Sequence, residues 1–143
     1  MLTGLSDTAE DDCASCVVVT SPGEVPDITD KLSKSDDLNL IRVSGAGYKV
    51  LCVIEGLAAC SINSKSCTYA WDTCGPHGIL LSMGGGAVSY KDAMQSSDCD
   101  SVAQLSYRPK TPEYAKKVHC NCNGLIAYKS MTALQTVLQT LKS

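Results

Sequence analysis

Blocks of apolar residues alternate with polar, turn-forming stretches along this chain, and their lengths predict strands and helices in turn. Five short apolar or β-branched blocks are typical of buried strands, and they lie at residues 16–21, 38–44, 60–65, 86–90 and 124–130. Helical segments separate most of these strands. The alternation predicts an α/β fold in which a layered mixed sheet is flanked by helices.

Four segments predict helices. Residues 27–37 start with Asp27, which favours an N-cap position, and predict a short exposed helix. Residues 47–59 are apolar on nearly every side, which predicts a helix that is buried all round. Residues 72–83 predict a third helix. The chain ends in an amphipathic helix whose apolar face consists of Leu134, Val137, Leu138 and Leu141.

The chain length of 143 residues suits a single domain. We expect residues 1–15 to be a flexible N-terminus and residues 16–143 to form one α/β domain. Within that domain, residues 91–122 are polar and contain Pro109 and Pro112. They predict a variable surface excursion.

Charge and hydropathy narrow the classes of partner. The formal net charge is −3 and the lysines and arginines form no cluster, which argues against nucleic acid or an anionic membrane as a partner. No apolar run approaches the roughly 18 residues of a membrane span, and the first residues lack the pattern of a secretory signal. We therefore expect a cytoplasmic protein.

The nine cysteines are odd in number and scattered, which favours reduced thiols over a disulfide framework. Cys13 and Cys16 form one close group, and His119, Cys120 and Cys122 form another. Together they offer soft ligands for zinc. The two groups are far apart in the chain, however, and the second has a spacing that is poor for zinc, so we expect unlinked thiols.

The turn that leads into the helix at 47–59 is the first candidate for chemistry. Gly45, Ala46 and Gly47 leave backbone N–H groups open to close approach by an anion, and Lys49 can reach the same anion. The alternative is that the glycines merely allow a tight turn and close packing. An isolated Gly-Ala-Gly favours that alternative.

Asp72 is the second candidate. It stands where the helix at 72–83 begins, so one interpretation is an N-cap that contributes about 1 kcal/mol to stability. The other interpretation is a ligand for magnesium, which prefers carboxylate oxygens and retains several waters. The position by itself favours the cap.

Three motifs occur in an order and at a spacing that resemble one family: SGAGYKVLCVIEGLAA, then WDTCGPHGILLSMGGG, then GLIAYKS before the final helix. They resemble the C-terminal half of the inositol monophosphatase family, which comprises magnesium-dependent, lithium-inhibited phosphatases and includes bisphosphate nucleotidases. The Tyr48-Lys49 pair and GLIAYKS favour its inositol polyphosphate 1-phosphatase branch. The resemblance implies the C-terminal half of a sugar-phosphatase fold.

The resemblance also implies roles for single residues. In such enzymes the aspartate matching Asp72 binds catalytic magnesium beside the scissile phosphate. Residues matching Gly45, Ala46 and Lys49 hold the substrate, and so does a loop serine that matches Ser21. The family hydrolyses its ester with metal-activated water, so the implied reaction is removal of the 1-phosphate from inositol bisphosphate.

The sequence departs from the family pattern in one major respect. An Asp-Pro-Ile-Asp-Ser-Thr signature and an upstream acidic pair supply most of the family's metal ligands, and nothing in this sequence matches them. Gly23 also stands where the branch carries a lysine, and Cys67 where it carries a threonine. We therefore expect half an enzyme that is inactive by itself. Inositol monophosphate and a 3′-phosphonucleotide remain alternative substrates.

A second hypothesis comes from a different class of function. The half fold would then be a non-catalytic binding domain that holds the missing N-terminal half, or a partner protein, on the surface that would face that half. A coding sequence upstream of Met1 that contains the missing signature would identify the chain as a fragment.

Overall fold

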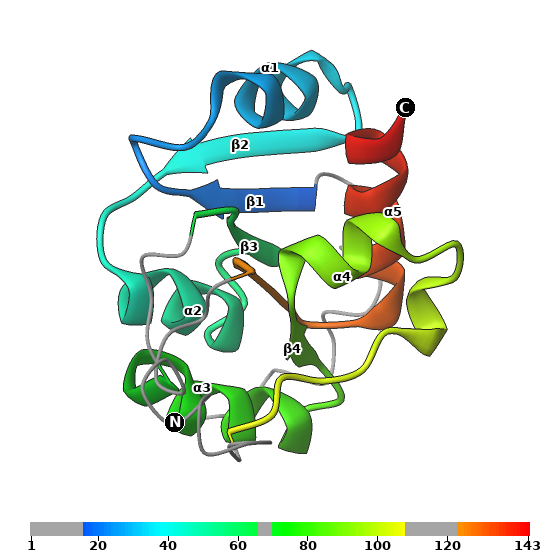
Figure 1. The fold of residues 1–143 in the computed structure, drawn as a ribbon. Coiled ribbons are helices and arrows are strands. Elements are labelled where there is room, and N and C mark those ends of the chain that lie inside the picture. The colour runs from blue at the N-terminus through cyan, green and yellow to red at the C-terminus, as the bar shows by residue number, and fades with distance from the viewer. Residues whose placement is uncertain (1–15, 66–69, 108–122) are drawn as a thin grey trace, which may run out of the picture.

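A five-stranded sheet forms the centre of the part of the chain that the computed structural model describes, which is residues 16–65, 70–107 and 123–143 (Figure 1). Its strands follow the order β2-β1-β3-β5-β4. β1 pairs in parallel with β2 and β3, whereas β5 pairs antiparallel with β3 and β4. The predicted mixed sheet is thus confirmed, with bounds β1 Cys16–Thr20, β2 Leu38–Arg42, β3 Cys60–Asn63, β4 Gly86–Val88 and β5 Leu125–Tyr128.

Helices cover both faces of this sheet (Figure 1). One face packs against α1, α4 and α5, and the other against α2 and α3. The helices are α1 Pro26–Lys34, α2 Ala46–Ile54, α3 Ala70–Ser82, α4 Tyr90–Gln95 and α5 Met131–Lys142, and a short 3-10 helix, η2, spans Cys99–Ser101. No helix within the described ranges is long and apolar enough to cross a membrane.

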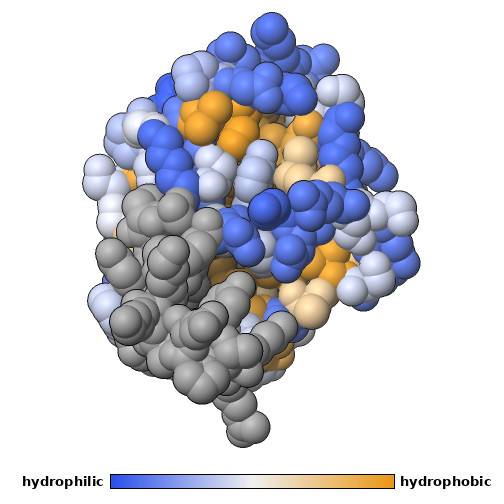
Figure 2. All heavy atoms as spheres, in the orientation of Figure 1, coloured by the Kyte–Doolittle hydropathy of each residue, from blue (hydrophilic) through white to orange (hydrophobic). Residues whose placement is uncertain are grey.

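The two cores follow from strand alternation, because successive side chains of a strand point to opposite faces. In β1, Val18 packs on the face covered by α1, α4 and α5, and Val19 packs on the face covered by α2 and α3. The predicted apolar face of α5 is confirmed, since Leu134, Val137, Leu138 and Leu141 are all buried in the first core. In Figure 2, hydrophilic side chains cover the region of α1, as expected for an amphipathic helix.

The start of α1 differs from the prediction. The helix begins at Pro26, with Val25 at the N-cap and no side-chain cap, so the predicted cap at Asp27 is wrong. Proline suits the first helical position, because the N–H it lacks would have no partner there. Asp27 instead lies in the first turn and pairs with Lys31 at 3.8 Å.

Part of the predicted surface excursion at 91–122 is packed structure. Most of helix α4 lies there, capped by the Ser89 side chain, and its Ala93 is fully buried in the core. Gln104 forms a bridge to Val88 at the end of β4. Residues 108–122 lie outside the described ranges.

The prediction that the second helix is buried all round is wrong. Val50 and Val53 of α2 face the sheet, but Tyr48 is 53% exposed and Leu51 is 42% exposed. Leu57, just after the helix, is 61% exposed. The described part of the chain covers only one side of α2, so apolar side chains on the other side of this helix are exposed.

The three consecutive glycines after α3 have separate causes. Gly84 ends the helix with φ +88°, a conformation that favours glycine. A Cβ at Gly85 would lie 2.3 Å from the carbonyl oxygen of Tyr128, and a Cβ at Gly86 would lie 2.7 Å from the Tyr128 hydroxyl. Glycine is therefore required for β4 to approach β5 and the side chains around it.

Candidate functional site

The carboxyl ends of β1, β2 and β3 meet at one edge of the sheet, because these strands run parallel. The chain leaves β1 toward α1 on one face, and leaves β2 toward α2 on the other face. In open α/β sheets, ligands bind at such an edge, where successive connections depart for opposite faces. Three of the predicted site residues, Ser21, Gly45 and Ala46, lie in the loops at this edge or directly after them.

Lys49 and Ser21 are brought together at this edge. The Nζ atom of Lys49 donates a hydrogen bond of 2.8 Å to the Oγ atom of Ser21, although 28 positions separate them in the chain. Lys49 is only 4% exposed, whereas Ser21 is half-buried. A buried ammonium is weakly screened, which strengthens its attraction for an anion.

The start of α2 adjoins this pair. Gly45 is the N-cap residue with φ +94°, a conformation that side chains rarely adopt, and no side chain caps the helix within the described chain. Gly45 is exposed and Ala46 half-buried, so the first backbone N–H groups lie near the surface. Uncapped N–H groups and the positive end of a helix attract anions. The tight turn and the open helix start therefore coexist.

The Glu24 carboxylate links the loop after β1 to the loop after β3 through hydrogen bonds. It accepts hydrogen bonds from the backbone N–H of Val25 at 2.8 Å and from the backbone N–H of Ser64 at 3.0 Å. The Ser64 hydroxyl donates a further bond to it. Glu24 is 7% exposed, so these bonds compensate for its burial. The sequence analysis missed this residue, because a loop glutamate carries no pattern that reveals a distant partner.

An open hollow of about 460 Å³ borders Ser64. It is lined by Ser64, Tyr90, Lys91, Met94, Gln95 and Asn123. Burial raises the pKa of the Tyr90 hydroxyl, and the carboxylates of Glu24 and Asp27 raise it further. This hydroxyl therefore stays neutral near physiological pH.

Asp72 lies in the first turn of α3 and is half-buried. The helix begins at Ala70, two residues earlier than predicted, so Asp72 is not the N-cap residue and that interpretation is wrong. A carboxylate in the first turn is still favoured by the helix dipole. Helix α3 packs against α2, which carries Lys49, so the two predicted site elements are neighbours.

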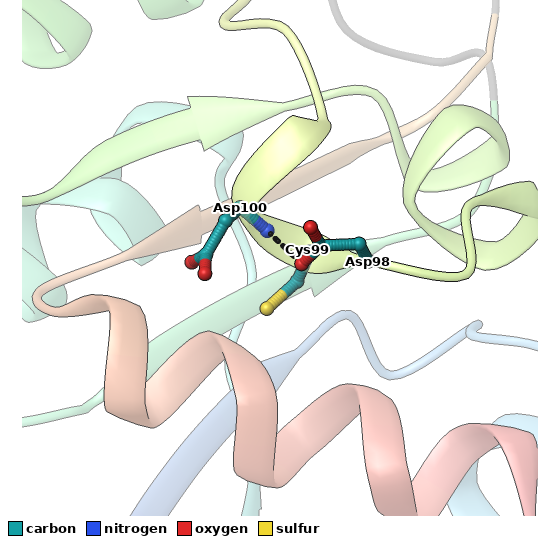
Figure 3. Close-up of side chains that lie close together, drawn as sticks. All are labelled: Asp98, Cys99 and Asp100. Carbon is teal, nitrogen blue, oxygen red and sulfur yellow. Dashed lines mark hydrogen bonds between the residues drawn. The ribbon is translucent and has the colours of Figure 1, made fainter.

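The described residues do not assemble several metal ligands around Asp72. Within the described ranges, one group of three His, Cys, Asp or Glu side chains has ligand atoms within 4.8 Å of one another, and it consists of Asp98, Cys99 and Asp100. In Figure 3 the Asp98 carboxylate accepts a bond from the Asp100 backbone N–H, as an N-cap of η2 does. Cys99 points toward α5 and packs on the core. This cluster serves the local structure, and it does not include Asp72.

The zinc prediction concerns residues that the structure mostly does not describe. Cys13, His119, Cys120 and Cys122 lie outside the described ranges. Cys16 lies in β1, where it is half-buried and packs on the face covered by α1, α4 and α5.

Comparison with known proteins identifies relatives over nearly the whole chain. The model of the inositol monophosphatase family matches residues 4–134. Inositol polyphosphate 1-phosphatase of Bos taurus is 39% identical over 138 residues, which cover 94% of this chain and 34% of the relative. The enzyme of the same name from Mus musculus is 39% identical over 126 residues, covering 86% of this chain and 32% of the relative.

A second group of relatives is more distant. The 3′(2′),5′-bisphosphate nucleotidase 1 of Dictyostelium discoideum is 36% identical over 81 residues, which cover 54% of this chain and 25% of that protein. The chain spans about a third of the length of its more similar relatives. The family match and the mixed α/β sheet agree with the resemblance noted in the sequence: this chain belongs to the inositol monophosphatase family.

Proposed function

We propose that this chain is the substrate-binding part of a magnesium-dependent, lithium-sensitive phosphatase that removes the 1-phosphate from inositol bisphosphate. The observation that carries the proposal is the 2.8 Å bond between Lys49 and Ser21 beside the uncapped start of α2. The relatives' names supply the substrate class. Inositol monophosphate or a 3′-phosphonucleotide would use the same groups.

The groups at this edge can hold a phosphate without a metal. The N–H groups at Gly45 and Ala46 donate hydrogen bonds, the Lys49 ammonium supplies charge, and the Ser21 hydroxyl donates a further bond. The Nζ atom of Lys65 also donates to the carbonyl of Gly23 in the Ser21 loop. That loop thus has a second ammonium beside it, although Gly23 replaces the lysine expected from the family pattern.

Asp72 would hold one magnesium ion, and the bound ion would supply activation of water. A carboxylate in the first turn of a helix suits a hard cation, but one carboxylate does not make a complete site. The remaining ligands would come from outside the described residues. We therefore infer that this chain binds substrate but does not turn it over alone, and that it acts in the cytoplasm, where its cysteines stay reduced.

Binding of inositol 1,4-bisphosphate, measured by calorimetry, tests the proposed substrate site. Lys49→Met keeps the length of the side chain and removes its charge, so we expect affinity to fall by about tenfold or more, as for loss of a charged hydrogen bond. Lys91→Met is the matched control, because Lys91 is an exposed lysine at the same edge of the sheet. Equal losses in the two variants would refute specific binding at Lys49.

A second candidate function is supported by the exposed apolar side chains of α2 and α3. Among the described residues, seven of the nine large apolar side chains that are exposed belong to these two helices or follow them directly: Tyr48, Leu51, Leu57, Trp71, Ile79, Leu81 and Met83. Patches of this kind mark interaction surfaces. We propose that this surface binds the polypeptide that completes the phosphatase, which corresponds to the N-terminal half of the relatives or to a separate partner protein.

The N-terminal part of a close relative, expressed separately, tests the second candidate. We expect it to bind this chain, and Leu57→Gln with Ile79→Gln to weaken that binding. Val25→Gln is the control, because Val25 is 38% exposed but is the N-cap residue of α1, which packs on the opposite face of the sheet. Binding that survives the double substitution, or that Val25→Gln weakens equally, would contradict the proposed surface.

A further inference from the structure

A chain of hydrogen bonds links α3 to the sheet through the segment that follows η2. The imidazole of His77, 3% exposed, lies between two polar groups: its Nδ1 atom is 2.8 Å from the Tyr107 hydroxyl, and its Nε2 atom is 2.8 Å from Gln104 Oε1. Gln104 Oε1 also accepts from the Ala87 backbone N–H at 2.9 Å, and Gln104 Nε2 donates to the Tyr128 hydroxyl at 2.6 Å. The chain thus runs from α3 to β4 and β5.

The backbone of β4 determines the direction of each bond. The Ala87 N–H only donates, so the Gln104 atom that faces it must be the amide oxygen. An oxygen cannot donate to His77, so His77 Nε2 carries the hydrogen of that bond, and the Tyr107 hydroxyl can donate to Nδ1. Burial raises the pKa of the Tyr107 hydroxyl, which keeps it protonated as that donor requires.

Tyr107 also reaches the first turn of α3. Its hydroxyl is hydrogen-bonded to the side chain of Thr73, which is 1% exposed. Thr73 and His77 are four positions apart and therefore lie on one face of the helix. The Tyr107 ring packs edge-on against the His77 ring, with centroids 5.6 Å apart. One tyrosine thus holds two successive turns of α3.

This part of α3 is weak by composition. Pro76 lies inside the helix and lacks the N–H that would bond the carbonyl of Asp72. Gly75 and Gly78 flank it, and both are poor helix formers. The residues that bind this helix to the sheet therefore matter more for its first turn than they would in a helix of good formers.

We propose that Tyr107 and Gln104, acting through His77, are positioning residues that hold the first turn of α3, and with it Asp72, in place against the sheet. The inference rests on the proposed function, because that function makes Asp72 a metal ligand. The proposal gives neither residue a contact with the substrate or the metal. Gly86 belongs to the same arrangement, because a Cβ there would lie 2.4 Å from Gln104 Oε1.

Amide hydrogen exchange in two matched variants tests the proposal. Tyr107→Phe and Tyr128→Phe each delete one hydroxyl, the first at the helix end of the hydrogen-bond chain and the second at the sheet end. We expect the amides of Cys74 and Gly75 to exchange about tenfold faster in Tyr107→Phe than in Tyr128→Phe, since only the first variant releases the helix. The amides of Leu80 and Leu81 should exchange alike in both. If the amides of Cys74 and Gly75 exchange at the same rate in the two variants, the proposal is overturned.

Nitrogen NMR of the His77 ring gives an independent test. We expect Nε2 to carry the ring hydrogen that is donated to Gln104. In Tyr107→Phe the Nδ1 resonance should shift, because that atom loses its donor. A ring with its hydrogen on Nδ1, or a resonance unchanged in Tyr107→Phe, would contradict the hydrogen-bond chain on which the proposal depends.

Broadening of NMR signals by Mn²⁺ separates this proposal from the proposed function. We expect Mn²⁺ to broaden the signals around Asp72 in the natural chain, less in Tyr107→Phe, and not in Asp72→Asn. Broadening that Tyr107→Phe leaves unchanged would contradict the positioning role. If the natural chain shows no broadening, the metal role of Asp72 fails, while the exchange comparison still decides whether Tyr107 holds the helix.

Discussion

The carboxylate of Glu24 accepts hydrogen bonds from both the backbone N–H and the hydroxyl of Ser64, 40 positions away in the chain. Glu24 belongs to the loop that carries Ser21, and Ser64 directly follows β3. The loop that contributes to the Lys49 contact is therefore fixed to the neighbouring strand by a buried acid. Substitution of Glu24 or Ser64 therefore measures how much these bonds contribute to the free energy of unfolding.

Glu24→Ala should lower the free energy of unfolding by about 1.5–3 kcal/mol, because buried donors that bonded to a charged group lose their acceptor. Urea denaturation measures the loss. Ser64→Ala is the control: it removes only the hydroxyl and keeps the backbone bond, so it should cost less. Equal stability of Glu24→Ala and the natural chain would contradict the role of this carboxylate.

The purified chain should show no magnesium-dependent phosphatase activity above background. Among the described residues, Asp72 belongs to no cluster of three or more His, Cys, Asp or Glu side chains, and the family's first metal signature is absent from the sequence. Phosphate release from inositol 1,4-bisphosphate measures this. Lithium-sensitive turnover by the chain alone would show the prediction to be wrong.

Addition of the N-terminal half of a close relative should restore some magnesium-dependent, lithium-inhibited hydrolysis. Asp72→Asn should then abolish it, since the amide keeps the shape of the side chain and removes the charge that holds magnesium. Lys49→Ala should raise KM more than it changes the magnesium dependence, as expected for a group that meets phosphate. Activity that persists in Asp72→Asn would exclude Asp72 as a metal ligand.

The free energy of unfolding of the chain should fall as the pH rises above about 8.5, which is the ordinary pKa of a cysteine thiol. Burial, and then the nearby Cys16, raise the pKa of the Cys60 thiol, while Lys129 lowers it, and the net change is upward. The folded chain therefore keeps this proton at a pH where the unfolded chain loses it, so the free energy of unfolding decreases as pH increases through that interval. Urea denaturation at several alkaline pH values measures the decline. It should be shallower in Cys60→Ala than in Cys74→Ala, because Cys74 is exposed.

We expect mostly reduced thiols and no stoichiometric zinc in protein prepared without a chelator. The spacing of Cys13, Cys16, Cys120 and Cys122 is poor for a preformed site. Metal analysis and thiol titration measure both properties. One zinc per chain, lost when Cys13 and Cys16 are replaced, would favour a zinc-stabilised binding domain instead.

The sequence by itself determined the strands and the final helix, because their signals are local. The block at residues 16–21 is β-branched and ends in a turn, and β1 forms there. The apolar spacing from Leu134 to Leu141 repeats with the period of a helix, and α5 buries those residues. The motifs around Lys49 and Asp72 were enough to identify the family, because they keep its order and spacing.

Only the tertiary structure decided which residues meet. The Lys49–Ser21 and Glu24–Ser64 bonds join loops that follow different strands, and they exist because parallel pairing brings those strand ends to one edge. His77 carries no sequence signal that distinguishes a surface residue from a buried one. Its role follows from Gln104, which β4 orients through a backbone N–H. Contacts of this kind depend on where the chain returns in space, and hydrophobic periodicity records only which face of an element is apolar.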